Sequence, residues 1–170
     1  QRMGVEWDSV NDTMVRLDAI RDKAHEIDEI TWRDGLVSGY ENHLYLVSCS
    51  DMEGDPEAFG GRLETFLEEA RSRDGDRKNG FVRLGYVGVP PIAPEIYDFC
   101  ESMGARVVYN ETQRQFSLPF DSRDPVEKYL LYSYPYSIFY RMNDIRREAE
   151  SRGLDGILHY VQSFCFRQVE

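Results

Sequence analysis

The sequence is poor in cysteine and has no long apolar run. Its three cysteines, Cys49, Cys100 and Cys165, are too few and too scattered for a disulfide framework, so we expect a reducing, cytoplasmic compartment. No apolar stretch approaches the roughly 20 residues of a membrane span, and no signal peptide is visible. The chain starts at Gln1 without an initiator Met and ends at Glu170 inside a nascent helix. We therefore expect it to be a fragment of a larger enzyme.

Basic residues are fewer than acidic residues in this sequence. Lysine and arginine together number 20 against 31 acidic residues, which gives a formal net charge of −11. Because nucleic acids and anionic membranes attract clustered basic residues, this balance predicts that neither is a partner. Arg141, Arg146, Arg147 and Arg152 are close in sequence, but acidic residues lie among them. We interpret that segment as a solvated helix face.

The common nucleotide and metal motifs are also absent. The run Gly85–Gly88 lacks the G-x-G-x-x-G pattern of a dinucleotide site, and Pro90 and Pro91 remove amide donors that would contact phosphate. NAD, FAD and P-loop nucleotides are therefore not expected. There is no C-x-x-C, and no histidine stands at ligand spacing from a cysteine. A complete zinc or iron–sulfur site cannot be identified from these residues alone.

The first half of the chain has the apolar spacing of helices. Apolar residues at three- and four-residue intervals predict a helix over 8–32. A second helix is expected after Ser38, and a third from Asp55-Pro56, an N-cap followed by proline at the first helical position, to about Ala70. The residues expected to face inward on the second helix are Tyr40, Leu44 and Val47. The polar segment 71–80 is then predicted to be a linker or a surface loop.

After that loop, strands and helices alternate. Strands are predicted over 81–87, 105–109 and 154–161, and a longer excursion over 110–123. Helices are predicted over 94–103, from Asp124-Pro125 onward, and over 137–151. The inward residues of the last helix are expected to be Phe139, Met142, Ile145 and Ala149.

Short crossovers of this kind imply an α/β fold with a Rossmann-like or flavodoxin-like parallel sheet in the order 2-1-3. We divide the chain into a helical region, 1–74, and a Rossmann-like domain, 75–170, truncated at its carboxyl end. In this order the loop Val89–Pro91 and the loop Ser163–Cys165 face each other across one crevice, where open parallel sheets bind ligands.

Cys165 is the strongest candidate for a functional residue. It follows the last strand where the next helix should begin, and a helix N-terminus favours the thiolate that binds metal or reacts. Alternatively, Phe164 and Phe166 enclose it in a small apolar cluster. Cys49 and Cys100 lie at helical positions where core packing is the better interpretation. No catalytic residue is assigned.

Two further features have competing interpretations. His159 lies in a strand that the pattern predicts to be covered on both faces, so we expect a hydrogen-bonded core histidine. The tyrosine-rich element 131–137 could line a pocket for an acyl or aromatic group, since tyrosine has an apolar face and a polar tip. It could equally be a packing surface for another part of the protein, which we favour.

Several of these segments resemble the 2-hydroxyacyl-CoA dehydratase D-component family, which includes subunits of 2-hydroxyglutaryl-CoA dehydratase and of BCR-type benzoyl-CoA reductase. The resemblance depends on the following segments: 83–91, 101–108, Asp124-Pro125, Pro135 followed by Arg141, and Asp155-Gly156-Ile157 followed by Phe164-Cys165. The helical first half, with Leu36–Gly39, fits the segment that precedes this domain in the family.

The resemblance implies a cofactor and partners. Family members are oxygen-sensitive subunits that each hold a [4Fe–4S] cluster through three cysteines, and Cys165 matches the third cysteine, which comes from this domain. The implied partners are an acyl-CoA substrate, a second homologous subunit, and an ATP-dependent iron–sulfur activator protein that delivers one electron. The implied reaction is radical elimination of water from a 2-hydroxyacyl-CoA.

The sequence departs from the family in two places. The two upstream cluster cysteines are absent, so we expect this chain alone to hold no stable cluster and to be inactive. Tyr136 follows Pro135 where relatives have a cysteine or a small residue, which leaves dehydratase and benzoyl-CoA reductase both open. A non-catalytic Rossmann-like interaction module is the main alternative, and a thiol redox role for Cys165 is the third.

Overall fold

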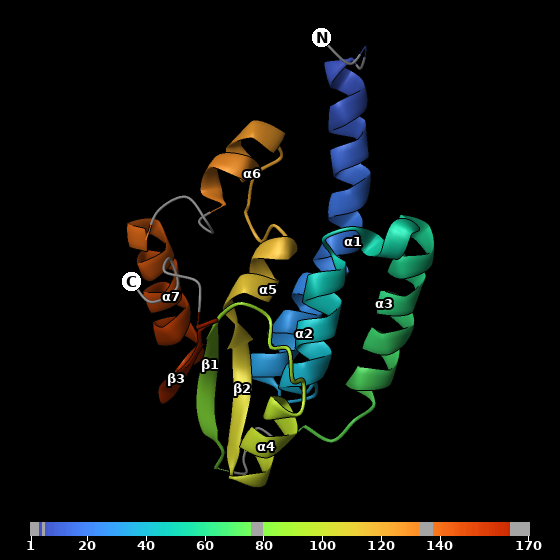
Figure 1. Ribbon diagram of the computed structural model, residues 1–170. Helices are drawn as coiled ribbons and strands as arrows, with labels where there is room; N and C mark the ends of the chain where they lie inside the picture. Colours follow the sequence, from blue (N-terminus) through green and yellow to red (C-terminus); the bar gives the residue numbers. More distant parts are fainter. Residues whose placement is uncertain (1–3, 5, 76–79, 133–137, 164–170) are drawn as a thin grey trace.

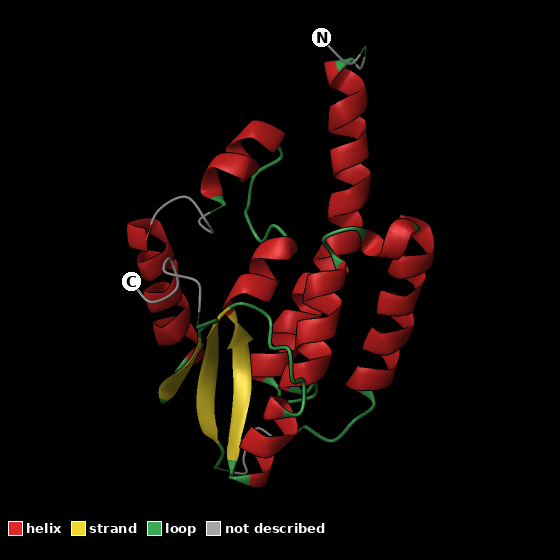
Figure 2. Ribbon diagram, viewed as in Figure 1, coloured by secondary structure: helices red, strands yellow, loops and turns green. Residues whose placement is uncertain are grey.

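The computed structural model describes residues 4, 6–75, 80–132 and 138–163. The first half is helical and the second half alternates strands and helices, as Figure 2 shows. The helices are α1 (Trp7–Arg33), α2 (Gly39–Ser48), a short 3-10 turn η1 (Met52–Gly54), α3 (Pro56–Arg71), α4 (Ile96–Ser102), α5 (Glu111–Phe116), α6 (Pro125–Leu131) and α7 (Ile138–Arg152). The strands are β1 (Val82–Gly88), β2 (Ala105–Asn110) and β3 (Gly156–Tyr160).

The helices α1, α2 and α3 pack side by side and enclose the larger hydrophobic cluster (Figure 1). Fully buried side chains at its centre are Ala24, Ile27, Leu46, Phe59 and Leu63. Helix α2 follows Ser38 as expected, and α3 begins at the predicted Asp55 cap. The Ser38 hydroxyl and the Glu41 carboxylate form a capping box on α2, and the Asp55 carboxylate accepts a hydrogen bond from the Ala58 amide on α3.

The strands form a parallel sheet in the order β2-β1-β3, which confirms the predicted α/β class and strand order. Leu84 of β1 pairs with Val107 of β2 and with Gly156 of β3. Helices α2 and α4 pack on β2 near Val107, and the Arg152 side chain of α7 lies over the ring of Tyr109. A smaller hydrophobic cluster therefore forms around the sheet, separate from the helical one. The division of the chain into two domains stays a prediction.

Helix α7 buries a different face from the predicted one, although Ile145 and Ala149 are half-buried. Phe139 and Met142 are 75% and 50% exposed, whereas Asp144, Glu148 and Arg152 are buried. The expected inward apolar stripe is therefore wrong at Phe139 and Met142. The physical reason is that the charged side chains meet oppositely charged partners on α1 and α5, which offset the cost of burying the charges. The predicted solvated arginine face is confirmed at Arg146 and Arg147, which are exposed. It is wrong at Arg152, a buried ion-pair partner, and at Arg141, which is half-buried and paired with Glu111.

Two other predictions need correction. Leu44 on α2 is 44% exposed, and the inward side of that helix instead includes Asn42, His43 and Leu46. The excursion predicted over 110–123 contains a helix that the sequence pattern did not predict, because α5 begins directly after β2. The Asp124-Pro125 start of α6 is confirmed, with the Asp124 carboxylate accepting a hydrogen bond from the Val126 amide.

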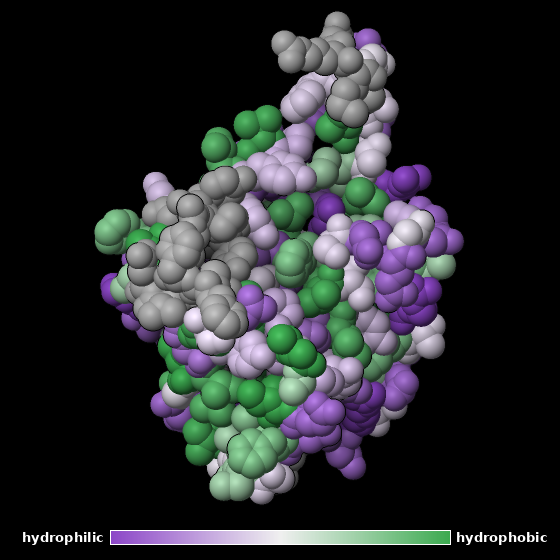
Figure 3. All heavy atoms as spheres, viewed as in Figure 1, coloured by the Kyte–Doolittle hydropathy of each residue, from purple (hydrophilic) through white to green (hydrophobic). Residues whose placement is uncertain are grey.

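Apolar side chains are unevenly spread over the surface. In the view of Figure 3, hydrophobic residues gather over the sheet and on α6, while the side formed by α3 is largely hydrophilic. Helix α6 contributes Tyr129 and Leu130, and α7 contributes Phe139 and Tyr140, each more than half exposed. Among the described residues, no helix is both long and apolar enough to cross a membrane.

Candidate functional site at the carboxyl edge of the sheet

The parallel order brings the carboxyl ends of β1 and β3 next to each other. Gly88, the last residue of β1, pairs with Tyr160, the last residue of β3. The loop Val89–Pro91 and the segment that follows Tyr160 therefore leave the sheet at the same edge, as the predicted crevice requires. Cys165 itself lies outside the described residues, so its position stays a prediction.

Gly88 makes the close approach of these two strands possible. Its φ is +113°, and an added Cβ would lie 2.1 Å from the Tyr160 carbonyl oxygen. Only glycine adopts this backbone conformation and leaves room for the neighbouring strand. The turn after β1 is therefore fixed by a residue that cannot carry a side chain.

Glu111, the first residue of α5, connects the elements at this edge. Its side chain is buried, and its Oε2 accepts hydrogen bonds from the Gly88 amide at 2.9 Å and from Arg141 Nη2 at 2.8 Å. Arg141 Nε donates to the other carboxylate oxygen, so the ion pair is bidentate. Thr112 completes the contact by donating its hydroxyl to the Gly88 carbonyl at 2.5 Å. One carboxylate thus connects the end of β1, α5 and α7.

A second polar cluster lies beside the end of β2. The Tyr97 hydroxyl of α4 is 2.8 Å from Asn110 Oδ1, to which it donates, and 3.1 Å from His43 Nδ1 of α2. Gln113 Nε2 of α5 lies 3.0 Å from the same imidazole nitrogen. Burial lowers the pKa of His43, so the imidazole is neutral near pH 7. These side chains are buried and form one hydrogen-bonded group.

This cluster continues into the helical region. Asn110 Nδ2 donates to Asn42 Oδ1 at 2.7 Å and to the Gly39 carbonyl at 3.0 Å. Asn42 Nδ2 in turn donates to Asp28 Oδ1 of α1 at 2.9 Å. The hydrogen bonds therefore run without interruption from the carboxyl end of β2 to the last two turns of α1.

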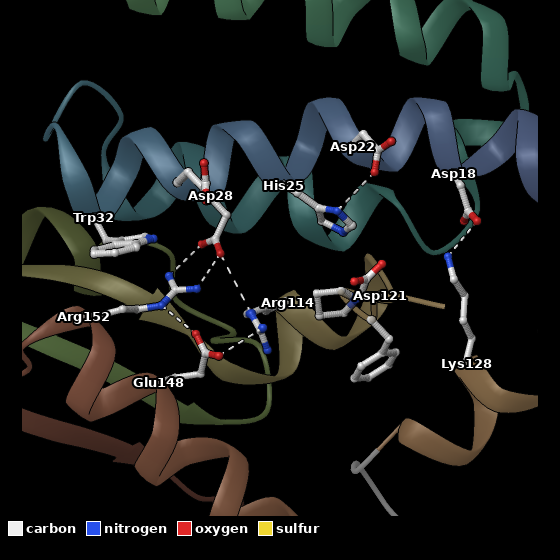
Figure 4. Close-up of a pocket in the computed structure, with 13 residues that line it drawn as sticks. Asp18, Asp22, His25, Asp28, Trp32, Arg114, Asp121, Lys128, Glu148 and Arg152 are labelled. Carbon is white, nitrogen blue, oxygen red and sulfur yellow. Dashed lines mark hydrogen bonds and ion pairs between the residues drawn. The ribbon is translucent and has the colours of Figure 1, made fainter. Parts of the chain in front are cut away.

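Asp28 is the centre of a buried ion-pair network, drawn in Figure 4. Arg152 Nη2 lies 2.6 Å from Asp28 Oδ2, and Arg152 Nε lies 2.9 Å from Glu148 Oε2. Arg114 Nη2 lies 3.1 Å from the other Glu148 oxygen. Burial alone would raise the pKa of Asp28, but the charge and hydrogen bonds of Arg152 hold it below its ordinary value. The same pairing raises the pKa of Arg152 despite its burial.

The network forms one wall of a pocket of about 420 Å³ between α1, α5 and α7. His25 Nε2 lies 3.0 Å from the Ser117 carbonyl, and burial lowers the pKa of His25. Lys128 Nζ lies 2.7 Å from Asp18 Oδ2. The lysine and arginine charges of this pocket are thus matched by carboxylates, which indicates a structural role. Among the described residues, no group of three or more His, Cys, Asp or Glu could hold a metal ion.

The remaining sequence-predicted residues have these positions. Cys49 and Cys100 are buried, as predicted, and burial raises the pKa of both thiols, that of Cys49 to about 12. The prediction for His159 is wrong, because this side chain is exposed. Within the described part of the chain β3 pairs with β1 alone, so its residues alternate between half-buried and exposed. Of the tyrosine-rich element, residues 133–137 lie outside the described residues.

Sequence reasoning missed Asn110, Glu111 and Gln113. They stand directly after a predicted strand, and polar residues at the carboxyl end of a parallel strand are a signal that could have identified them. Because no helix was predicted over 111–116, these polar residues were not recognised as lying at the end of a strand and the start of a helix.

A family model described as 2-hydroxyglutaryl-CoA dehydratase, D-component, matches residues 3–169. The chain belongs to this family. No curated protein and no solved structure matches the chain.

The D-component match spans the helical first half as well as the sheet. The Glu111 contacts, the polar cluster beside the end of β2 and the α1 residue that this cluster contacts therefore lie inside the family's region. The description of the family names one component of a dehydratase.

Proposed function

We propose that the chain is part of an iron–sulfur subunit of a 2-hydroxyacyl-CoA dehydratase, an enzyme that eliminates water from its substrate after one-electron reduction. The observation that carries this proposal is the family match over residues 3–169. The parallel sheet agrees with it, because the end of β3 lies beside the loop after β1, where such sheets bind ligands. The substrate class is an acyl-CoA.

Cys165 is the proposed cluster ligand from this chain. A [4Fe–4S] cluster is held by several cysteine thiolates. Cys49 and Cys100 do not suit that role, because burial raises their thiol pKa values and keeps them protonated. Further thiolates must then come from polypeptide outside these 170 residues, so the isolated chain is inactive. The cluster, when bound, supplies an iron site that can polarise the substrate's oxygen atoms.

The test is anaerobic iron–sulfide reconstitution of the protein in which this chain occurs, with iron counted per polypeptide. We compare the wild type with Cys165→Ser and with Cys49→Ser as a matched control. Cys49 suits this purpose because its thiol donates to the Tyr45 carbonyl, a bond that a serine hydroxyl also makes. We expect the iron content to be lost in Cys165→Ser and retained in Cys49→Ser.

Equal iron in the wild type and in Cys165→Ser would contradict the ligand assignment. Where iron is bound, anaerobic assays with 2-hydroxyacyl-CoA and with benzoyl-CoA, each with the ATP-dependent activator and the second homologous subunit, distinguish a dehydratase from a BCR-type reductase.

A second candidate function is that of a non-catalytic interaction module. The observation in its favour is the outer surface of α6 and α7, where Leu130 and Phe139 are 79% and 75% exposed. This reading predicts that the reconstituted wild type holds no iron and that native Cys165 reacts slowly with an alkylating reagent.

A further inference from the structure

Helix α6 packs only loosely on the rest of the molecule. Of its seven residues only Pro125 and Lys128 are buried, whereas Tyr129 and Leu130 are 59% and 79% exposed. In the described part of the chain, no other helix or strand packs extensively against it, and Figure 1 shows it beyond the end of α5, away from the sheet. A helix this short is not stable by itself in water. The position of α6 therefore depends on a small number of contacts.

One of these contacts is a buried ion pair between α6 and α1. Lys128 Nζ lies 2.7 Å from Asp18 Oδ2, and the two side chains are 6% and 21% exposed. Asp18 has a second partner, because its other carboxylate oxygen lies 3.0 Å from Arg21 Nη1. A buried ammonium group is stable only when it is paired. Asp18 is thus held in place without Lys128, whereas the burial of Lys128 depends on Asp18.

The segment that leads into α6 has a strained residue at its start. Leu118 has a φ of +48°, which is unfavourable for a residue with a side chain. Strain of this kind occurs at switch regions, where a change in conformation relieves it. Directly before it, the Ser117 carbonyl lies 3.0 Å from His25 Nε2, so the chain is attached to α1 at this point. The segment 118–131 therefore has one attachment to α1 just before its start and another at Lys128.

Between these two attachments the segment covers a cavity. Phe120, Asp121 and Lys128 line the pocket of about 420 Å³, whose other walls include the ion-pair network around Asp28. Trp32 also lines this pocket, at the opposite end from Lys128 (Figure 4). A second cavity, of about 480 Å³, lies between the start of α6 and the first turns of α1. Cavities therefore border α6 in two places and leave room for it to move.

We propose that the segment 118–131 is a lid over the pocket of about 420 Å³, and that the ion pair between Lys128 and Asp18 is its latch. When the ion pair breaks, the segment turns about Leu118 as a unit and uncovers the pocket. Water then reaches the ion pair between Asp28 of α1 and Arg152 of α7. Because charges attract each other less strongly in water than in a protein interior, the lid controls how firmly α7 is held to α1.

This inference goes beyond the proposed dehydratase function and does not depend on an iron–sulfur cluster. It makes a specific prediction for the pocket. A lid that opens as a unit uncovers the far end of the pocket, whereas a helix that only frays at its ends leaves that part covered. The two cases are distinguished by measuring the pocket and the segment separately.

The experiment uses the whole chain with Lys128→Ala, which removes the latch. Alanine favours a helix, and Asp18 keeps its partner Arg21 in this variant. Glu64→Ala is the matched control. It removes a different ion pair of α1, in which Glu64 Oε2 lies 3.0 Å from Lys23 Nζ and the Glu64 side chain is 65% exposed.

Two measurements follow the pocket and the segment. Trp7→Phe is introduced into every protein, so that Trp32 is the only tryptophan of the chain. Quenching of Trp32 fluorescence by acrylamide measures access to the pocket, and hydrogen exchange followed by mass spectrometry measures the opening of 118–131. We expect Lys128→Ala to raise the quenching constant about two-fold and to speed exchange in 118–131 several-fold, with exchange in α1, α2 and α3 unchanged. The control should match the parent protein in both measurements.

Three results would overturn the proposal. Faster exchange in 118–131 without greater quenching of Trp32 means that α6 frays and the pocket stays covered. No change in either measurement means that the ion pair is not a latch. Faster exchange across the whole chain means that the variant unfolds globally.

If Lys128→Ala does not fold, as judged by circular dichroism, the Trp7→Phe protein alone decides the question. Exchange in 118–131 should then rise less steeply with urea concentration than exchange in α1, because a local opening exposes less surface than global unfolding. An equal dependence on urea in the two segments would refute the lid.

Discussion

At the scale of single residues, Gly88 and Glu111 decide the shape of the sheet edge. Both act through contacts that no other side chain at these positions could reproduce. Gly88 leaves space for the Tyr160 carbonyl, and Glu111 accepts from the Gly88 amide and from Arg141. Their substitution therefore measures how much of the molecule's stability depends on this edge.

We expect Gly88→Ala to destabilise the protein by about 2–6 kcal/mol, because a strained positive φ and a steric overlap with Tyr160 add together. Urea unfolding of the two proteins measures the difference. Gly61→Ala is the matched control, because its added Cβ would meet no atom within 4 Å on helix α3. That variant should be more stable by about 0.5–1 kcal/mol. Equal effects of the two substitutions would refute the close-approach argument.

Glu111→Gln should cost about 3–5 kcal/mol, because it leaves the Arg141 guanidinium, whose side chain is only 11% exposed, without its counter-charge. Glu57→Gln removes a carboxylate from an exposed pair with Arg16 at 3.9 Å and should cost less than about 1 kcal/mol. Urea midpoints of both variants test the contrast. A loss for Glu111→Gln no larger than that for Glu57→Gln would show that the edge does not depend on this carboxylate.

Single residues also show which features could be predicted from the sequence and which could not. The helix starts at Ser38, Asp55 and Asp124 were predictable, because a cap depends on residues only two or three positions away. Asp28 and Arg152 are 124 positions apart, so no local pattern could reveal that they pair. The role of Cys165 was proposed from its position and the family resemblance, and it awaits the reconstitution experiment.

At the scale of elements, α7 shows why periodicity alone misleads. Its sequence has an apolar face and a charged face, and the usual expectation buries the apolar one. Part of the charged face is buried instead, where Asp28 on α1 and Arg114 on α5 complement Glu148 and Arg152. The strand order, by contrast, was predictable because right-handed crossovers leave few alternatives.

The contact between α1 and α7 should depend on pH through Asp28. Its pKa is lower in the folded protein than the ordinary value of 3.8, so its pairing stabilises the fold above about pH 4 and is lost as the pH falls through the folded-state value. The pKa of Asp144 is raised by burial, which acts in the opposite direction. We expect the wild type to lose more stability between pH 5 and 3 than Asp28→Asn does.

Urea unfolding at several pH values provides this comparison, with Asp12→Asn, an exposed position on α1, as the control. The control should follow the wild-type pH profile. Parallel profiles for the wild type and Asp28→Asn would show that the ion pair contributes nothing to acid sensitivity.

At the scale of the whole molecule, the protection of backbone amides against hydrogen exchange should decrease from the central strand of the sheet outward. Strand β1 pairs with both neighbours, whereas β3 pairs with β1 alone in the described part of the chain and alternates between half-buried and exposed residues. Hydrogen exchange followed by mass spectrometry should therefore show the slowest exchange in β1 and much faster exchange in β3 and α6. Exchange in β3 as slow as in β1 would contradict this order and would mean that a further segment covers the outer edge of β3 in solution.

The bridge formed by Asn110 and Asn42 has a consequence for how this protein can change over evolutionary time. It joins the end of β2 to α2 and, through Asp28, to α1 and α7 by buried hydrogen bonds. A substitution on one side leaves a polar group on the other side without its partner. The helical half and the sheet half must therefore be inherited as a matched set, and a chimera that takes each half from a different relative would have to restore these amide contacts.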